Sequence, residues 1–250
     1  MLRRLRRTPP AGQGPPPNDP IVAVPEFELT EASTPEEYWL WADELPAHLL
    51  SDSGISLAYS CCVPQRALIA ALLSSAKSAN LLKICSIGSG PSLLEWLLTT
   101  NRDGLPCICV DGFADGDDEW LIPPARVKRR TRDDSLCFVQ THQLEEWHTA
   151  DALLLFCWPL LDQVAARAYI RQFSCAPTRG RAVAVIADGT CCPSGDQVSA
   201  WLREDEATDD STGLSPWRRI REEAAATLGP PCILSVFMRE EVGGAACAMS

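Results

Sequence analysis

Apolar runs alternate with amphipathic segments along most of the chain. The run at 81–87 is apolar apart from Lys83 and Ser86, which is typical of a parallel strand covered on both faces. Further strand-like runs occur at 106–110, 136–139, 152–157, 182–187 and 232–238. Helical patterns occur at 34–45, 64–77, 93–98, 163–173, 196–203 and 216–228. Strands that alternate with helices predict an α/β fold, a doubly wound and mostly parallel sheet with helices on both faces.

The strand at 81–87 runs directly into a glycine-containing turn and then into a helix. Gly88 and Gly90 allow a tight reversal and let bare backbone approach a ligand closely. The helix that follows has its apolar positions at Leu93, Leu94, Leu97 and Leu98. This spacing predicts that Glu95 lies on the other side of the helix. The unit places backbone N–H groups and a helix N-terminus beside the mouth of a pocket.

The spacing around this turn narrows the class of ligand. A nicotinamide fingerprint, GxGxxG, needs a third glycine at position 93, where the chain has Leu93. Asp111 ends the next apolar run, 23 residues after Gly88. A carboxylate at that place can accept hydrogen bonds from both hydroxyls of a ribose. We therefore expect a nucleoside at the turn, and a glycine turn beside a surface aspartate with no ligand remains the alternative.

The N-terminal part differs in composition from the rest of the chain. Residues 1–20 combine four arginines with many prolines and predict a disordered tail, followed by a helical extension at 21–60 and an α/β domain at 61–250. Within the extension, Thr34, Pro35 and Glu37 form a helix-start pattern. The aromatic residues after it favour packing against the sheet over a lid on the pocket.

Charge restricts the possible partners. The net charge is −11, and without the four arginines of the first seven positions 18 basic residues face 33 acidic ones. This balance argues against a broad nucleic-acid footprint. Five basic residues cluster at 126–132. A solvated loop or an exposed strand edge is favoured there over a local nucleic-acid patch.

The twelve cysteines and the hydropathy of the chain bear on its compartment. No CxxC pair occurs, so no metal site is expected. No secretory signal and no apolar run of about 18 residues occurs, which predicts a reduced, cytoplasmic chain without a membrane span. Five cysteines fall in predicted buried strands, where a thiol acts as a small apolar group: Cys85, Cys107, Cys109, Cys137 and Cys157.

Five segments, in order, resemble a family of methyltransferase-like proteins of the class I, S-adenosylmethionine-dependent type. They are YSCCVP at 59–64, IGSGPS at 87–92, LLLFCWP at 153–159, VAVIADGTCCPSGD at 183–196, and Trp217. The family usually has an acid where this chain has Ser86 and the third glycine of a GxGxG loop where it has Ser92. The resemblance implies a Rossmann-like fold with a seven-stranded sheet, and S-adenosylmethionine as cofactor.

The resemblance and the residues around the predicted rim suggest roles for individual side chains. The cofactor-binding candidates are Ser86, Gly88, Gly90, Ser92 and Asp111. Trp158 and Pro159 would form the floor of the acceptor site, and His142 or Asp188 would act as a base if one is needed. Alignment of nucleophile, methyl group and sulfur can supply much of the rate without a dedicated base.

Three functional interpretations follow. The first is an S-adenosylmethionine-dependent methyltransferase whose acceptor is a small molecule or a protein in preference to a nucleic acid. The second is a degenerate methyltransferase-like fold that acts as a binding or scaffold module, because Ser86, Ser92 and Leu160 replace usual functional residues. The third, a nicotinamide oxidoreductase, is disfavoured by Leu93. The identity of the acceptor and the oligomeric state stay open.

Overall fold

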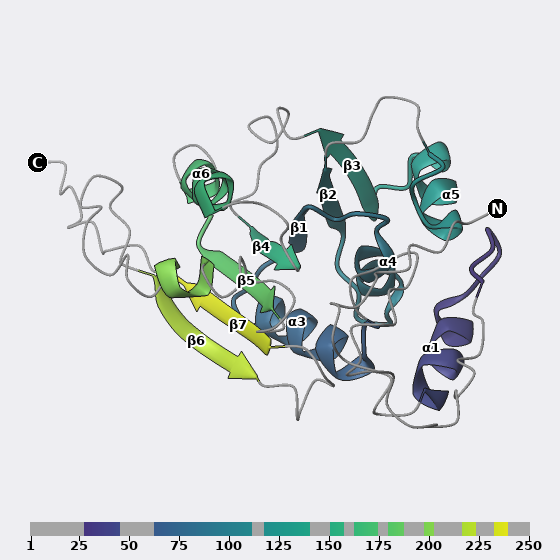
Figure 1. Cartoon of the computed structure of the whole chain (residues 1–250), viewed down its shortest axis with the longest axis horizontal. Helices are drawn as coiled ribbons and strands as arrows, with labels where there is room; N and C mark the ends of the chain where they lie inside the picture. Colours follow the sequence, from purple (N-terminus) through teal and green to yellow (C-terminus); the bar gives the residue numbers. More distant parts are fainter. Residues whose placement is uncertain are drawn as a thin grey trace, which may run out of the picture.

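The computed structural model describes residues 28–45, 63–111, 118–140, 151–157, 163–174, 180–187, 198–202, 217–223 and 233–239. Among them, helices cover both faces of a single seven-stranded sheet (Figure 1). The strands are β1 (Lys83–Ile87), β2 (Cys107–Asp111), β3 (Leu136–Gln140), β4 (Ala152–Cys157), β5 (Ala182–Ala187), β6 (Arg218–Glu223) and β7 (Ile233–Met238). The helices are α1 (Pro35–Glu44), α3 (Arg66–Ser78), α4 (Leu93–Thr100), α5 (Pro123–Thr131) and α6 (Gln163–Ser174), and residues 198–202 are also helical.

The order of the strands determines where a ligand can bind. The sheet runs β3-β2-β1-β4-β5-β7-β6, with β1 to β5 parallel and β7 antiparallel to both of its neighbours. The chain moves outward from β1 to β3 and then returns to β4 on the other side of β1. In a doubly wound sheet the crevice at such a reversal, beyond the carboxyl ends of the strands, is the usual ligand site. The turn after β1 lies at this place.

Two apolar cores lie on opposite faces of the sheet. One contains α1, α3, α4 and part of α5 against alternate strand residues such as Ile84, Cys109 and Leu155. The other contains α6 and residues 198–202 against the intervening strand residues, such as Ile87 and Phe156. This arrangement follows from strands with a side-chain period of two whose faces are both apolar. The predicted doubly wound, mostly parallel α/β fold is confirmed.

The start of α1 is explained by its sequence. The Thr34 hydroxyl accepts a hydrogen bond from the Glu37 backbone, and the Glu37 carboxylate accepts one from the Thr34 backbone at 2.8 Å. Tyr38, Trp39 and Trp41 are buried, and the Tyr38 hydroxyl donates to the Pro64 carbonyl oxygen at 2.9 Å. The aromatic residues therefore pack in the core, as expected. The predicted boundary of this extension at residue 60 lies outside the described residues.

One predicted element is wrong. Residues 216–228 read as a helix, whereas 218–223 form β6, an edge strand paired with β7. The arginine, glutamate and alanine residues there favour a helix locally, but hydrogen bonds to β7 override that preference. The Arg221 guanidinium also bonds to α3, at the Ala71 carbonyl oxygen (3.0 Å) and the Ser75 hydroxyl (3.0 Å). The charged residues of β6 suit an edge strand, because they discourage pairing with another chain.

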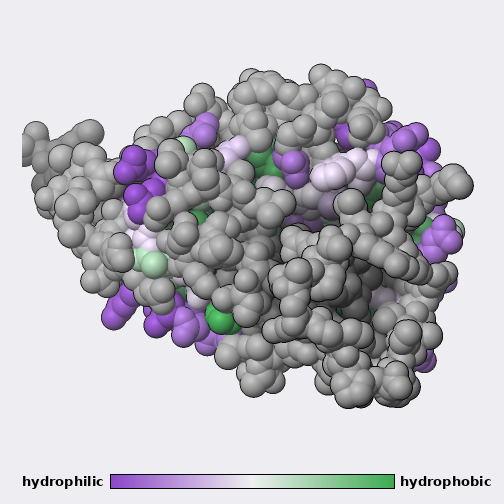
Figure 2. Space-filling view, in the orientation of Figure 1, coloured by the Kyte–Doolittle hydropathy of each residue, from purple (hydrophilic) through white to green (hydrophobic). Residues whose placement is uncertain are grey.

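The basic segment at 126–132 is also different from the prediction of a loop or strand edge. It forms most of α5, which begins with Pro123 and Pro124 in its first turn, where a missing N–H costs nothing. Arg129 pairs with Asp118, Arg130 with Glu31, and Lys128 with Asp133. Hydrophilic residues gather around α5 and over β6 on the face shown in Figure 2. Most of this positive charge is therefore paired within the chain.

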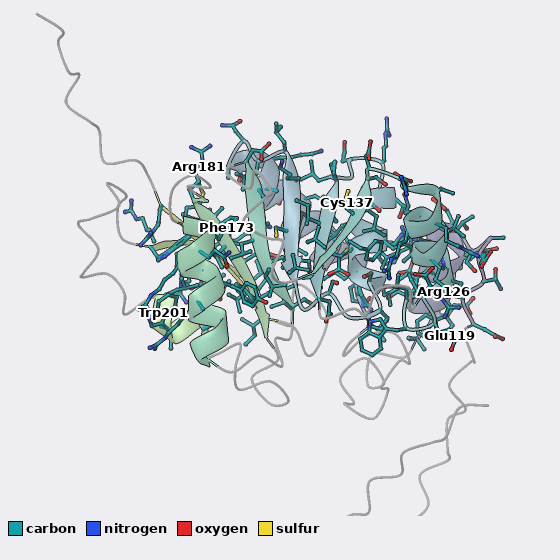
Figure 3. All side chains as sticks on the ribbon, turned by 90° about the horizontal axis from the view of Figure 1, so that it is seen from above. Glu119, Arg126, Cys137, Phe173, Arg181 and Trp201 are labelled. Carbon is teal, nitrogen blue, oxygen red and sulfur yellow. The ribbon has the colours of Figure 1, made fainter. Side chains whose placement is uncertain are left out.

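Most of the other predicted segments are confirmed to within about two residues at each end. The strands at 152–157 and 182–187 have the predicted bounds. Cys85, Cys107 and Cys109 are buried as expected, whereas Cys137 and Cys157 are only partly buried. Figure 3 shows Phe173 and Trp201 at the α6 end of the molecule and Glu119 and Arg126 at the α5 end. The predicted tail at 1–20 lies outside the described residues.

Candidate functional site

The turn after β1 has the backbone conformation that its glycines allow. Gly88 and Gly90 have φ angles of +70° and +54°, and Ser92 has a φ angle of +67°. These angles lie in the left-handed region, where a side chain costs about 1 kcal/mol or more. Ser92 therefore adopts a glycine-like conformation at the place where the resembled family has its third glycine. The loop therefore keeps this backbone conformation with serine in place of glycine at position 92.

Asp111 is tied to this turn. Its Oδ2 accepts a hydrogen bond from the Gly90 backbone N–H at 2.8 Å, and the Gly88 N–H donates to the Val110 carbonyl oxygen at 2.8 Å. These bonds hold the turn against the carboxyl end of β2. The carboxylate of Asp111 and the backbone of the glycines thus lie together at the reversal point of the sheet.

Among the described residues, no atom crowds the two glycines of the turn. A Cβ atom built on Gly88 or Gly90 meets no described atom within 4 Å. The glycines are therefore required by their φ angles and not by crowding from neighbouring side chains. Backbone at this place can be approached by a ligand, which is the condition that a nucleoside site needs.

The structure contradicts one expectation about α4. Glu95 was expected on the other side of the helix from the leucines, but it is buried, with 1% of its surface exposed. Its Oε1 accepts a hydrogen bond from the Ser86 hydroxyl at 2.5 Å. Sequence reasoning missed this pair. Ser92 and Glu95 have the S-x-x-E spacing of a capping box, yet Ser92 makes no side-chain cap, and Glu95 turns inward towards β1.

Burial determines the ionisation of Glu95. Desolvation raises the pKa of its carboxyl group from 4.5 to about 7. Hydrogen bonds from the Ser86 hydroxyl and from its own backbone N–H act in the opposite direction, and the charge of Asp111 raises the pKa further. Two buried side-chain oxygens in this region, Ser89 Oγ and Glu95 Oε2, have no hydrogen-bond partner among the described residues.

The buried thiols of β1 and β2 are poor nucleophiles. Desolvation raises the pKa of Cys85 to about 12 and that of Cys109 well above its usual value. Glu95 raises the pKa of Cys109 further. Because the thiolate is the reactive form, these cysteines are chemically inert in the folded chain. In the described ranges, no three His, Cys, Asp or Glu residues are placed to hold a metal ion.

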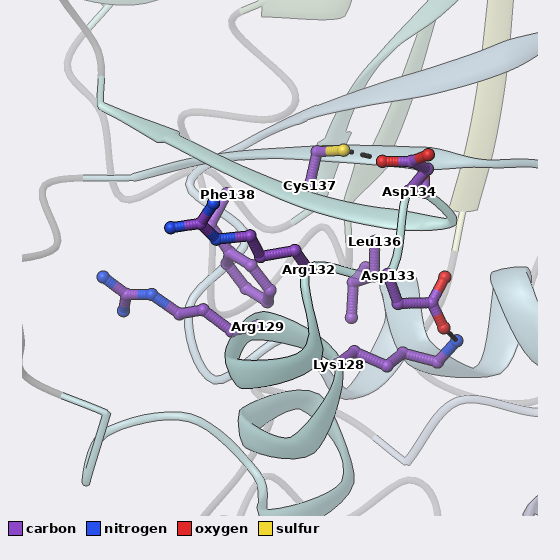
Figure 4. Close-up of a pocket in the computed structure, with 8 residues that line it drawn as sticks. All are labelled: Lys128, Arg129, Arg132, Asp133, Asp134, Leu136, Cys137 and Phe138. Carbon is purple, nitrogen blue, oxygen red and sulfur yellow. Dashed lines mark hydrogen bonds and ion pairs between the residues drawn. The ribbon is translucent and has the colours of Figure 1, made fainter.

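A concave region lies between α5 and the edge strand β3 (Figure 4). It has a volume of about 230 Å³ and is lined by Lys128, Arg129, Arg132, Asp133, Asp134, Leu136, Cys137 and Phe138. Lys128 Nζ lies 2.7 Å from Asp133 Oδ2, and hydrogen bonds from Lys128 and Ser135 lower the pKa of Asp133 to about 2. Arg129 lies 5.8 Å from the centre of the Phe138 ring. These charges stabilise the α5–β3 contact and lie apart from the glycine turn.

The remaining candidates fall outside the described part of the chain. His142, Asp188, Trp158 and Pro159 are among the residues whose placement is not described. The cofactor-binding candidates Ser86, Gly88, Gly90, Ser92 and Asp111 are described, and they share one edge of the sheet. Their roles remain predictions. No helix in the described ranges is both long and apolar enough to cross a membrane.

The chain is similar to several solved structures. The methyltransferase domain of bacterial CtHen1 has 15% sequence identity over 69% of this chain and 98% of that chain, with a TM-score of 0.45. Human methyltransferase 10 domain containing protein has 12% identity over 82% of this chain and 97% of that chain, with a TM-score of 0.46. Cofactor-bound Rv0187 from MTB has 11% identity over 72% of this chain and 82% of that chain, with a TM-score of 0.45. No protein-family model and no curated protein matches the chain.

The architecture rests on the order and direction of the strands and on the helices that cover both faces. The chain has a Rossmann-like, doubly wound α/β fold. Its glycine turn and Asp111 lie where such a sheet binds ligands.

Proposed function

We propose that the chain is an S-adenosylmethionine-dependent methyltransferase. The observation that carries the proposal is the turn after β1, where Gly88 and Gly90 expose backbone with positive φ angles at the reversal point of the sheet. Asp111 reaches the same turn from the end of β2. Bare backbone beside a carboxylate suits a nucleoside, because the backbone permits close approach and the carboxylate accepts hydrogen bonds from ribose hydroxyls.

The described residues fit this cofactor. No described atom lies within 4 Å of a Cβ built on Gly88 or Gly90, and the ribose hydroxyls would share the Asp111 carboxylate with the Gly90 N–H. When bound, S-adenosylmethionine supplies an activated methyl group on a sulfonium. The chain would orient it, hold it at the turn, and align the acceptor with the methyl group and sulfur, which lowers the barrier without a dedicated base.

The acceptor side of the proposal rests on the sequence. Trp158 and Pro159 would form the floor of the acceptor site, and His142 or Asp188 would remove a proton from the acceptor where one must leave. A small molecule or a protein is favoured as acceptor. The chain has a net negative charge, and three of the α5 cations are paired with acidic residues of the chain. Both observations argue against a broad nucleic-acid interface.

A second candidate function is a non-catalytic binding or scaffold module. It is favoured by Ser86, Ser92 and Leu160, which stand where functional residues are usual in the resembled family. A nicotinamide oxidoreductase is disfavoured, because Leu93 is buried in the first turn of α4 where the dinucleotide fingerprint needs glycine.

Calorimetric titration of the full chain with S-adenosylmethionine and S-adenosylhomocysteine tests the proposal. We expect saturable binding of both ligands and a loss of affinity in Gly90→Val, whose side chain would occupy the open space over the turn. Leu40→Ala, at an exposed position on α1, is the matched control and should bind as the wild type does. Absence of binding heat and of thermal stabilisation with both ligands would refute the methyltransferase proposal. Binding of NADH alone would favour the oxidoreductase.

A further inference from the structure

The concave region between α5 and β3, called here the α5–β3 pocket, lies apart from the glycine turn. It is lined by the last turn of α5 and by the first residues of β3, beginning with Leu136. The glycine turn instead follows the last residue of β1. Because β1, β2 and β3 are parallel, the start of β3 and the end of β1 point to opposite ends of the sheet. The pocket therefore has no part in the proposed binding of a nucleoside at the turn.

The size of the α5–β3 pocket limits what it can hold. Its volume is about 230 Å³. A cavity of about 150 Å³ is large enough for a benzene ring, whereas drug-sized ligands occupy about 300 Å³ or more. The pocket therefore has room for one ring that carries one small polar group, and it is too small for a dinucleotide.

Two guanidinium groups lie at one side of the pocket. Figure 4 shows Arg129 and Arg132 extending in the same direction past the Phe138 ring. Arg129 pairs with Asp118 at 3.1 Å, but a guanidinium carries more N–H donors than one carboxylate can occupy. The guanidinium of Arg132 has no hydrogen bond or ion pair with any other residue in the described part of the chain. Both arginines therefore have N–H donors for an anion.

The two acids of the pocket do not cancel this charge. In Figure 4 Asp133 and Asp134 lie on the side away from the guanidiniums. Asp133 Oδ2 accepts a hydrogen bond from Lys128 Nζ at 2.7 Å, so these two charges form a neutral pair. Asp134 is exposed, and solvent screens its charge. The guanidinium side of the pocket is therefore locally positive, in a chain whose net charge is −11.

The wall of the pocket beside the guanidiniums is apolar. Leu136 is buried, Phe138 packs against the same core, and Arg129 lies 5.8 Å from the centre of the Phe138 ring. Cations at the end of a helix also complement its dipole, but that effect needs the charge beside the last carbonyl groups. The guanidiniums of Arg129 and Arg132 instead extend past a ring of the neighbouring strand (Figure 4). An aromatic wall beside two guanidiniums suits a planar ring that carries an anionic group.

We propose that the α5–β3 pocket binds an aromatic phosphate or carboxylate, with the ring against Phe138 and the anionic group on Arg129 and Arg132. A nucleic acid suits the pocket less well, because a phosphate chain that continued past the single ring would meet Asp133 and Asp134. A free metabolite and a phosphorylated aromatic side chain of another protein both present the required chemistry. This site goes beyond the proposed methyltransferase activity and does not depend on it.

Ligand-detected NMR titrations of the full chain test the proposal with phenyl phosphate as the probe. Phenyl phosphate should bind at least about tenfold more tightly than inorganic phosphate or phenol, because each of these offers only one half of the interaction. Arg132→Gln should weaken phenyl phosphate by about 10-fold or more, the size of a lost charge-assisted hydrogen bond, at an unchanged midpoint of urea denaturation. Arg102→Gln, the same change at another exposed arginine, should leave the affinity unaltered. A blocked peptide with one phosphotyrosine, titrated in parallel, shows which source of the aromatic phosphate the pocket prefers.

Two further variants separate ligand binding from a structural role of the pocket. Phe138→Leu keeps an apolar side chain and removes the ring, so it should weaken phenyl phosphate and leave the affinity for inorganic phosphate unchanged. Asp134→Asn removes the exposed acid, so it should strengthen the binding of phenyl phosphate by about two- to fivefold at low salt. A purely structural pocket would show neither change.

The outcomes separate this inference from the proposed function. Absence of binding by the wild type towards both phenyl phosphate and the phosphotyrosine peptide overturns the inference, and so does equal affinity of wild type and Arg132→Gln. Tighter binding of a thymidine oligonucleotide than of phenyl phosphate, with the same loss in Arg132→Gln, would assign the surface to nucleic acid and also overturn it. S-adenosylhomocysteine should not displace phenyl phosphate, and displacement would place the probe at the glycine turn and refute the inference. A chain that binds phenyl phosphate and no S-adenosylhomocysteine would support the pocket and refute the methyltransferase proposal.

Discussion

Replacement of Glu95 by glutamine should abolish a pH dependence of stability that burial of this carboxyl group creates. Burial raises its pKa from 4.5 to about 7, so the folded chain favours the neutral acid. The stabilising contribution is fully present below pH 4.5 and is lost as the pH rises through 7. Each pKa unit corresponds to about 1.4 kcal/mol, so the free energy of unfolding should fall by about 3 kcal/mol between pH 4 and pH 8.

Glutamine keeps the shape of the side chain and carries no charge at any of these pH values. Urea denaturation followed by tryptophan fluorescence at pH 5, 6, 7 and 8 gives the free energy of unfolding of both proteins. Other titrating groups are common to both and cancel in the difference. From pH 5 to pH 8 this difference should move by about 2 kcal/mol in favour of Glu95→Gln. Leu98→Ala, a buried change on the same helix, should give a curve parallel to wild type. If the free energy of unfolding of Glu95→Gln also ran parallel to that of the wild type across this pH range, the reasoning would be refuted.

Three further predictions concern the turn, the first helix and the thiols. Gly90→Ala places a side chain at a φ angle of +54° and should lower the free energy of unfolding, measured by urea denaturation, by about 1 kcal/mol. The variant should also bind S-adenosylhomocysteine more weakly. An unchanged denaturation midpoint would contradict the assigned backbone conformation. Thr34→Ala removes one hydrogen bond of the capping box and should cost about 1 kcal/mol, whereas Thr34→Ser should cost much less. Alkylation at pH 8 followed by peptide mass spectrometry should label Cys137 well before Cys85 and Cys109, because burial keeps the latter two protonated. Early labelling of Cys109 would show that the region beneath the turn opens.

The sequence predicted the fold well because its strands are buried on both faces and carry unmistakable apolar runs. Ala152–Cys157 and Ala182–Ala187 have the predicted bounds for this reason. The edge strand Arg218–Glu223 has no such run, and only its partner β7 makes it a strand. Local preference therefore pointed to a helix there. Charged edge strands are a general weakness of single-sequence reasoning.

The sequence predicted the backbone turn of the candidate site, but it did not predict the buried polar contact between Ser86 and Glu95. Gly88, Gly90 and Asp111 followed from spacing, because tight turns and strand ends have strong sequence signals. Glu95 was misplaced, since a charged residue beside leucines on a short helix normally faces solvent. The Ser86 hydroxyl on the neighbouring strand donates a hydrogen bond to the buried Glu95 carboxyl group. A contact between residues nine positions apart and on different elements has no periodic signature.

The position of β7 between β5 and β6 has a consequence during synthesis. Residues 233–238 emerge from the ribosome long after β5, and until then the apolar strand Ala182–Ala187 has an unpaired side. Such a strand can associate with other nascent chains. Premature termination before residue 233 should therefore yield insoluble product, although every residue of the glycine turn and Asp111 would already have been made.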